Sequence, residues 1–212
     1  RVAPGISHKD MYREVLRPPS CFIWFGCMML TATTELAPGQ WVEVSLTNIV
    51  GLPGILVLVY VSALMFVMRH FAGAIVQHIS PVGLLWFSSL IAAVGLYLLS
   101  IADPPAVVFG AATVWGIGVC YLYPTMVASV SERYPRGGAF VMGIMGFCAG
   151  LANQIFLPIM GGIFDRARLE AAGGVEALER LSGEAMAQVV RIASAESFQA
   201  TALIPLLLLP VF

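Results

Sequence analysis

The stretch PVGLLWFSSLIAAVGLYLLSIA, residues 81–102, contains no charged side chain. At 1.5 Å per residue a helix of this length reaches about 33 Å, slightly more than the ~30 Å hydrocarbon core of a bilayer. The same pattern recurs along the chain, because Lys and Arg are absent from residues 18–68, 70–132 and 137–165. Residues 81–102 therefore predict a membrane-spanning helix, and the recurrence predicts several.

The composition is also typical of a membrane protein. Of the 212 residues, 59% are hydrophobic and 11% are charged, whereas soluble domains carry about 25% charged residues. So few charges cannot cover a water-facing surface, and the high hydrophobicity argues against a disordered chain. The net charge is −1 and no basic tract is present, so nucleic acid is not an expected partner. We expect a multi-pass integral membrane protein of the plasma (cytoplasmic) membrane, surrounded by the lipid bilayer.

The gaps between charged residues predict six spanning helices. They lie near 20–47, 52–72, 82–102, 105–130, 138–163 and 197–212. Turns are predicted at Ser80-Pro81, at Asp103-Pro104-Pro105 and at residues 134–138. We expect residues 1–19 to form a cytoplasmic loop and residues 20–212 to form the six-helix transmembrane bundle. The charged stretch 165–196 has apolar side chains at roughly helical spacing, which predicts one or two short amphipathic helices at the membrane surface.

The distribution of Lys and Arg predicts the orientation of the spans. Residues 1–19, the second-to-third connection and the fourth-to-fifth connection share one side of the predicted topology. Together they carry seven basic residues: Arg1, Lys9, Arg13, Arg17, Arg69, Arg133 and Arg136. The other side carries four, all within 165–196. The positive-inside rule therefore places residue 1 in the cytoplasm.

The sequence contains no pattern typical of an enzyme, a metal site or a cofactor site. The motifs HExxH, GxSxG and GxxxxGK[ST] are absent. The four cysteines lie inside apolar runs without a CxxC spacing, and we expect them to be buried small side chains: Cys21, Cys27, Cys120 and Cys148. We therefore expect no enzyme activity, no bound metal and no cofactor.

Glu35 is the most informative residue for function, because it lies inside the first predicted span. A charge at the bilayer centre costs about 2.5–3.5 kcal/mol on insertion scales, so such residues usually face an aqueous cavity or a partner. The same span offers no Lys or Arg, which predicts that Glu35 is protonated during part of a cycle or contacts water or a ligand. Gln40 and Trp41 follow on this helix, and the set suits a polar organic ligand such as a sugar. The alternative is an interfacial belt at the end of the span.

Polar and kink-forming residues also occur inside the later spans. Asn153 and Gln154 lie midway along the fifth span, where they line the same cavity or form hydrogen bonds between helices. Pro124 and Pro158 each remove one backbone donor and are expected to bend their helices. Such bends are ordinary in membrane helices, and the functional alternative is that they gate or line a cavity.

Small residues predict close helix packing in two spans. The fifth span carries Gly146 and Gly150 in a GxxxG spacing, and the fourth carries Gly116 and Gly118. Lipid tails are as apolar as leucine, so small residues hold spans together by allowing close backbone approach. We expect both spans to pack tightly on neighbours, as static contacts or as interfaces that slide during function.

Two connections resemble motifs of the major facilitator superfamily. Residues 69–81, RHFAGAIVQHISP, are similar to its cytoplasmic loop motif G-x-L-x-D-R-x-G-R. Gly73 and Ile75 match this motif, and Gln77 replaces its Asp. Residues 131–139, SERYPRGGA, resemble the E-R-[FY]-P-R-x-x-A loop that precedes span eleven of the same superfamily.

Two further segments extend the resemblance. Residues 153–161 are similar to the P-x-x-x-G ending of span eleven, one residue shorter, and residues 33–41 are similar to span seven of the sugar-permease-like branches. The resemblance implies the C-terminal six-helix half of a transporter, spans seven to twelve, built as 3+3 inverted repeats. Because the chain begins in a polar segment and ends inside an apolar run, we expect an N-terminal six-helix half of the same protein as its partner.

This resemblance implies secondary active transport of a small polar organic solute by alternating access. Coupling to protons is an open alternative. The expected substrate-binding residues are Glu35, Gln40, Trp41, Asn153 and Gln154. A cytoplasmic polar cluster is expected from Arg69, Gly73, Glu132, Arg133 and Arg136. This cluster either favours one gate state or serves only as the ordinary positive-inside anchor of the spans. The alternative function is a transport-inactive membrane receptor or signalling module on the same fold.

Overall fold

The computed structural model describes residues 7–50, 53–73 and 78–212, with residues 40–50 described as backbone only. All regular secondary structure within these residues is helical, which confirms the expected all-α class. The helices are α1 (His8–Leu16), α2 (Pro19–Val50), α3 (Ile55–His70), α5 (Pro81–Ile101), α6 (Pro105–Cys120), α7 (Leu122–Arg133), α8 (Gly138–Ala172), α9 (Val175–Arg180) and α10 (Gly183–Leu206).

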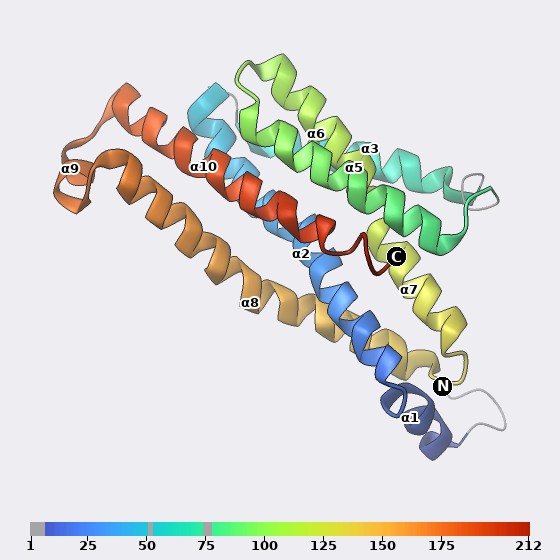
Figure 1. Ribbon diagram of the computed structural model, residues 1–212. Coiled ribbons are helices and arrows are strands. Elements are labelled where there is room, and N and C mark those ends of the chain that lie inside the picture. The colour runs from blue at the N-terminus through green and yellow to red at the C-terminus, as the bar shows by residue number, and fades with distance from the viewer. Residues whose placement is uncertain (1–6, 51–52, 74–77) are drawn as a thin grey trace.

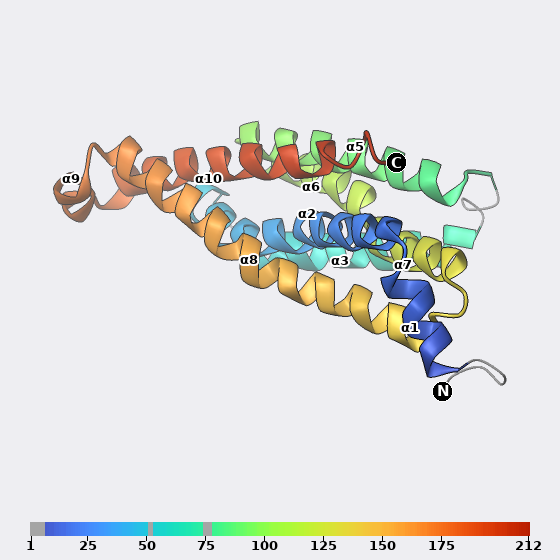
Figure 2. The same ribbon diagram turned by 60° about the horizontal axis from the view of Figure 1, so that its bottom comes forward.

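The long helices run back and forth and form an elongated bundle (Figures 1 and 2). One end of the bundle holds α1, the end of α3, the start of α5 and the α7–α8 turn, and the opposite end holds α9. α5 packs mainly on α6 and α10, and α8 packs mainly on α2 and α10. α6 and α7 together make one pass. The basic connections therefore share the end that carries α1, in agreement with the predicted alternation.

Within the described residues, four helices are long and apolar enough to cross a membrane: Pro19–Gly39, Pro81–Ile101, Pro105–Arg133 and Gly138–Ala172. They indicate an integral membrane protein. α3 is equally apolar, but its 16 residues reach only about 24 Å. α10 carries Glu184, Arg191 and Glu196 within its first fourteen residues, so its apolar part is short. The structure thus supports the membrane class, whereas the six-span half and its 3+3 repeats stay predictions.

The predicted turns are confirmed by their local geometry. The Ser80 hydroxyl accepts a hydrogen bond of 3.1 Å from the Gly83 N–H, and Pro81 occupies the first turn of α5. Gly138 begins α8 with a φ of 46°, and Gly173 ends it with a φ of 81°. Only glycine adopts such angles without steric cost, so these two residues determine where α8 starts and stops.

The charged segment 165–196 is organised differently from the expectation. Its first residues complete α8, its middle forms α9, and its last residues begin α10. α8 and α10 pack against each other here through four buried side chains: Phe164, Ala167, Val190 and Ala193. The expected division into short surface helices is therefore corrected. The apolar side chains at helical spacing in 165–196 do indicate a helix face that is shielded from water. Their periodicity does not show whether a neighbouring helix or a membrane surface covers that face.

The segment 1–19, expected as a loop, contains a helix that packs on the bundle. Val15 of α1 is fully buried. The Tyr12 ring lies edge-on to Phe140 of α8, with 4.6 Å between ring centroids. α1 is therefore part of the folded unit at the end where α2 begins.

The closest approach of two helices occurs between α5 and α6. A Cβ atom added to Gly118 would lie 2.3 Å from the backbone nitrogen of Ala92, and one added to Gly95 would lie 2.3 Å from the backbone nitrogen of Trp115. Side chains at these positions would collide with backbone, so both glycines are needed for this contact. The close packing expected of the fourth span is confirmed at Gly118.

The glycines of the fifth span do not serve the same purpose. A Cβ atom added to Gly143, Gly146 or Gly150 would meet no atom within 4 Å in the described part of the chain. Their face of α8 is therefore not covered by the described helices. The expectation that the GxxxG pair packs tightly on a neighbour is wrong within this chain.

We predict that Gly118→Ala destabilises the purified protein by about 1–3 kcal/mol, the usual cost of overpacking, because the added methyl group meets the backbone of α5. Gly110→Ala, on the same helix, is the matched control, because a Cβ atom there meets no described atom within 4 Å. It should leave stability unchanged or slightly raised, since alanine is the better helix former. The measurement is the midpoint of thermal unfolding in one detergent. Equal midpoints for the two variants would contradict the close α5–α6 contact.

Candidate functional site

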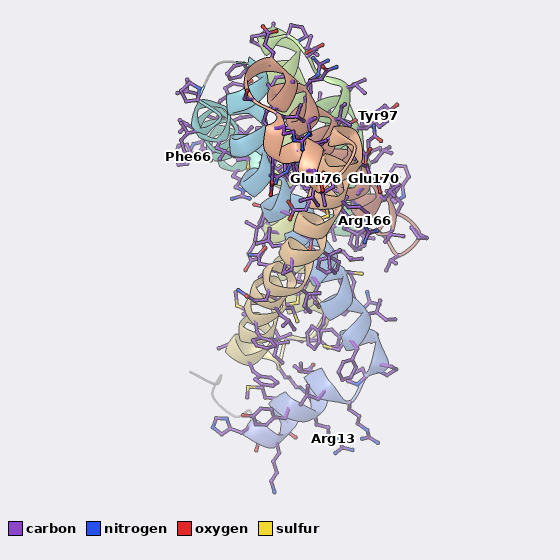
Figure 3. The ribbon with its side chains drawn as sticks, turned by 90° about the vertical axis from the view of Figure 1, so that its left-hand side faces the viewer. Arg13, Phe66, Tyr97, Arg166, Glu170 and Glu176 are labelled. Carbon is purple, nitrogen blue, oxygen red and sulfur yellow. The ribbon has the colours of Figure 1, made fainter. Side chains whose placement is uncertain are left out.

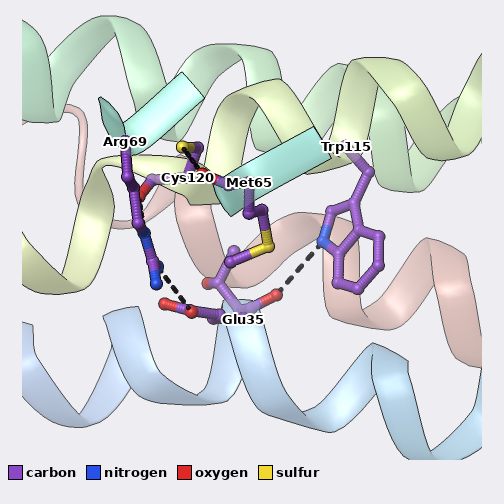
Figure 4. A network of polar contacts seen from close by, with 6 residues as sticks. Glu35, Met65, Arg69, Trp115 and Cys120 are labelled. Carbon is purple, nitrogen blue, oxygen red and sulfur yellow. Dashed lines mark hydrogen bonds and ion pairs between the residues drawn. The ribbon is translucent and has the colours of Figure 1, made fainter. Parts of the chain in front are cut away.

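Glu35 of α2 and Arg69 of α3 form an ion pair between the two helices (Figure 4). Arg69 Nη2 donates to Glu35 Oε1 at 3.1 Å. The Glu35 side chain is 15% exposed and the Arg69 side chain is 40% exposed, so the carboxylate is the more buried partner. The attraction between the two ions offsets part of the hydration free energy that each loses on burial. The pair is therefore less unfavourable than a single charge at this position.

Arg69 also binds the helix break between α6 and α7. Proline has no N–H, so Pro124 leaves the carbonyl of Cys120, four residues earlier, without its helical donor. Arg69 Nε donates to this carbonyl at 2.9 Å. α6 ends at Cys120 and α7 begins at Leu122, so the kink predicted from Pro124 is confirmed. The same guanidinium therefore satisfies a carboxylate and a proline-freed carbonyl.

A second proline-freed carbonyl lies in α2, next to Glu35. Pro38 leaves the carbonyl of Thr34 without a helical donor. Trp115 Nε1 of α6 donates to this carbonyl at 3.4 Å (Figure 4). α2 continues through the proline to Val50. A buried polar side chain from another helix thus replaces the missing backbone hydrogen bond, as expected where no water is at hand.

Two further hydrogen bonds attach α3 to the α6–α7 break. The Tyr121 hydroxyl donates to the Met68 carbonyl at 2.7 Å, and the Cys120 thiol lies 3.6 Å from the Met65 carbonyl. These contacts are independent of Glu35. α3 and the break therefore form one unit, to which α2 is joined by the ion pair and by the Trp115 hydrogen bond.

Glu35 keeps one carboxylate oxygen without a partner. Oε2 is buried, and no hydrogen-bond donor reaches it among the described residues. The hydroxyl of Thr31, one turn earlier on the same face of α2, is also buried and unpaired there. Buried polar atoms are usually satisfied. Two unsatisfied oxygens on one helix face can accept a proton or the donor groups of a ligand.

Asn153 and Gln154, two of the other predicted substrate-binding residues, form no hydrogen bond with this pair among the described residues. Asn153 of α8 is half-buried, and its Oδ1 has no hydrogen-bond partner in the described part of the chain. Gln154 is exposed. Gln40 and Trp41 lie outside the residues whose side chains are described. A common cavity of these four residues with Glu35 therefore stays a prediction.

The predicted cytoplasmic cluster is divided. Glu132 is exposed and lies twelve residues beyond Cys120, about 18 Å along α7. Arg69 is held at Cys120 by its hydrogen bond to the carbonyl. Gly73 is exposed, and a Cβ atom added to it would meet nothing within 4 Å. The structure thus places Arg69 with Glu35 rather than with the acidic and basic residues of the α7–α8 turn.

The remaining members of the cluster lie at the α7–α8 turn. Arg133 and Arg136 are exposed, and the Arg133 guanidinium carbon is 5.8 Å from the centre of the Trp24 ring of α2. The hydroxyls of Ser20 and Tyr134 share a hydrogen bond of 2.8 Å. This end of the bundle therefore joins the start of α2 to the end of α7 by a cation–π contact and a hydrogen bond.

The sequence predicts Glu35 as a site residue but does not predict its ion pair with Arg69. The first span contains no Lys or Arg, and the partner comes from the second span. A usable signal was present, because Glu35 and Arg69 each lie 17 residues from position 52. An antiparallel helix pair turning near that position brings both residues to the same level.

Comparisons with protein-family models, with curated proteins and with solved structures found no match for this chain. Among the described residues, no three His, Cys, Asp or Glu side chains gather where they could hold a metal ion. The proposals below therefore depend on the geometry of the chain itself and on the resemblance of its loops.

We predict that Arg69→Met lowers stability by about 1–3 kcal/mol, the range for a buried polar group that loses its partner. The double variant Glu35→Gln/Arg69→Met should recover part of this loss, because it leaves no unpaired carboxylate. Thermal unfolding midpoints of the two single variants and the double variant give the coupling.

Arg191→Met is the matched control for this cycle. Arg191 pairs with Asp103, and both side chains are about half exposed. Exposed pairs contribute about 0–1 kcal/mol, so this variant should change stability little. Additive effects of the Glu35 and Arg69 substitutions would show that the two residues are not coupled.

Proposed function

We propose that this chain is one half of a secondary transporter that moves a small polar organic solute by alternating access, with the movement coupled to protons. The observation that carries the proposal is the Glu35–Arg69 pair, which joins apolar helices beside two proline-freed carbonyls. Ionisable residues within membrane helices usually mark an ion or substrate pathway. The loops that resemble the major facilitator superfamily support the same function.

In this proposal Glu35 is the proton acceptor. A proton on Oε2, the oxygen without a partner, neutralises the carboxylate and removes its charge attraction to Arg69. Arg69 still has the Cys120 carbonyl as an acceptor, so its guanidinium is not left unpaired. One charge moved through 100 mV supplies about 2.3 kcal/mol. This energy is comparable with the loss of stability, about 1–3 kcal/mol, that is predicted above when Glu35 loses its partner.

Loss of the ion pair changes how α2 is attached to its neighbours. α3 stays joined to the α6–α7 break through Tyr121 and Met68. α2 keeps only the long Trp115–Thr34 hydrogen bond of 3.4 Å in this network. The protonation step is therefore proposed to release α2 from the unit formed by α3 and the break. Broken helices at such sites are the elements that move in many transporters.

The solute is proposed to bind on the same face of α2. The unpaired oxygens of Thr31 and Glu35 suit the hydroxyl or amino groups of a polar organic molecule. Asn153, with an unpaired buried oxygen, is a proposed contact from α8. Gln40, Trp41 and Gln154 remain proposed contacts on the basis of the sequence.

The exposed glycine face of α8 is the proposed surface for the N-terminal half. At Gly143, Gly146 and Gly150 the backbone of α8 is not covered by any described neighbour. Small residues on a membrane helix allow another helix to approach closely. Next to them, Phe147 is 67% exposed and Leu151 is 36% exposed, which adds apolar contact area. This face fits the packing of further helices of the same protein.

We predict that Glu35→Gln in the full-length protein abolishes solute-driven proton movement and retains counterflow of the same solute. The reason is that the amide still accepts hydrogen bonds but cannot carry the coupling proton. Proteoliposomes that enclose a pH-sensitive dye report proton movement when hexoses, pentoses or nucleosides are added one at a time. Isotope exchange in the same vesicles reports counterflow.

Glu132→Gln is the matched control, because it makes the same chemical change at an exposed residue. It should keep both activities. Equal loss of both activities in Glu35→Gln, or loss of neither, would argue against a coupling role. Solute binding without any counterflow in the unsubstituted protein would favour a transport-inactive receptor.

We predict that Gly146→Leu lowers transport by the full-length protein, because a large side chain would separate α8 from the other half. Gly110→Leu on α6 is the control, since a Cβ at Gly110 also meets no atom within 4 Å but lies on another helix. Counterflow in proteoliposomes measures the effect. Unchanged transport in both variants would place the partner helices elsewhere.

A further inference from the structure

α1 lies at the point where the first membrane helix begins and carries three kinds of side chain around its axis. Met11 and Val15 are buried against the bundle. Tyr12 and Leu16 form the neighbouring face, and each is 46% exposed. The third face is charged and consists of Asp10, Arg13, Glu14 and Arg17. By helical spacing the arginines lie between the exposed apolar face and the acidic residues.

The charged face of α1 borders a pocket at the start of α8. Arg13, Arg17 and Arg136 line this pocket of about 430 Å³, together with Asp10, Glu14 and Pro18. Figure 3, which views the molecule from the α9 end, shows Arg13 on α1 pointing away from the bundle. Three guanidinium groups, two from the end of α1 and one from the α7–α8 turn, therefore surround one solvent-open space.

None of the three arginines forms an ion pair with another described residue. The ion pairs found among the described residues are Arg69–Glu35 and Arg191–Asp103, and both lie elsewhere. Three guanidinium groups and two carboxylates leave the pocket with a net charge of about +1 at neutral pH. Each guanidinium carries five N–H donors in a planar fork that fits phosphate oxygens. The pocket is therefore complementary to a phosphate group.

The surroundings of the pocket are apolar on the membrane side. Pro18 lies between the pocket and α2, and the first turns of α2 expose Phe22 and Ile23, each by 57%. Leu16 and Tyr12 are two further exposed apolar side chains, on α1. A free phosphate ion makes no apolar contact with these side chains, whereas the acyl chains of a phospholipid would cover them.

We propose that Arg13, Arg17 and Arg136 bind the phosphate group of an anionic phospholipid, with Tyr12 and Leu16 in the headgroup region and the acyl chains beside Phe22 and Ile23. The site lies at the basic end of the bundle, where the positive-inside rule expects the anionic leaflet. It joins α1 to the membrane surface at the entrance of α2. This assignment does not depend on whether the protein transports a solute.

The test measures lipid binding to the purified full-length protein in detergent by native mass spectrometry. The probes are dioleoylphosphatidylglycerol and dioleoylphosphatidylcholine, each added alone. We expect preferential binding of phosphatidylglycerol. Arg13→Gln/Arg17→Gln should weaken that binding by about 25-fold, since each arginine near the surface contributes a factor of about five. Binding of phosphatidylcholine should not change.

Arg166→Gln/Arg180→Gln is the matched control, because it also removes two positive charges but at the α9 end of the bundle. It should keep the phosphatidylglycerol affinity. Equal weakening by both double variants, or by neither, would overturn the assignment. Displacement of bound phosphatidylglycerol by millimolar inorganic phosphate would show a site for free phosphate and would also overturn it.

A measurement on the unsubstituted protein covers the case in which the double variant does not fold. The phosphatidylglycerol affinity should fall several-fold when the salt concentration rises from 50 mM to 500 mM, because exposed charge interactions are screened. The affinity of phosphatidylcholine should stay constant. An affinity for phosphatidylglycerol that does not depend on salt would contradict a phosphate contact with arginines.

Discussion

Backbone carbonyls without a helical donor must find one within the protein when no water is near. Pro38 and Pro124 each create such a carbonyl in long apolar helices. The structure supplies a side-chain N–H from another helix in both cases, from Trp115 to Thr34 and from Arg69 to Cys120. These two hydrogen bonds join α2 to α6 and α3 to the break between α6 and α7. The rest of the polar site is built around them.

Arg69 connects the charge of Glu35 to the shape of the kinked helix. Its Nε holds the Cys120 carbonyl and its Nη2 holds the carboxylate, so the two contacts share one rigid guanidinium. A lysine could not make both contacts with the same geometry, because it lacks the planar fork. A change in the charge of Glu35 would therefore alter one contact of a group whose other contact fixes a helix break. This is the physical basis for treating the pair as a coupling element.

Glycines in this chain have two different roles. Gly95 and Gly118 allow the backbones of α5 and α6 to touch, and neither position has space for a methyl group. Gly146 and Gly150 have the same residue type and a more familiar spacing, yet nothing in the described chain covers them. The first pair belongs to the interior of the bundle, and the second pair lies on a face of α8 that the described helices leave uncovered. α1 has neither kind of glycine contact. It exposes arginines and apolar side chains together, as expected of a helix at a lipid headgroup layer.

Local features of the sequence were sufficient for the membrane class, for the helix breaks and for Glu35. Lengths without charge, prolines and turn glycines act on their own segment, so their effects at 81–102, at Pro124 and at the 134–138 turn follow from the sequence alone. The partner of Glu35, the two glycine roles and the pairing of 165–172 with 183–196 could not be obtained in this way. Each depends on the rotation and register of one helix against another. That arrangement is set by the packing of the whole bundle, and only the tertiary structure decides it.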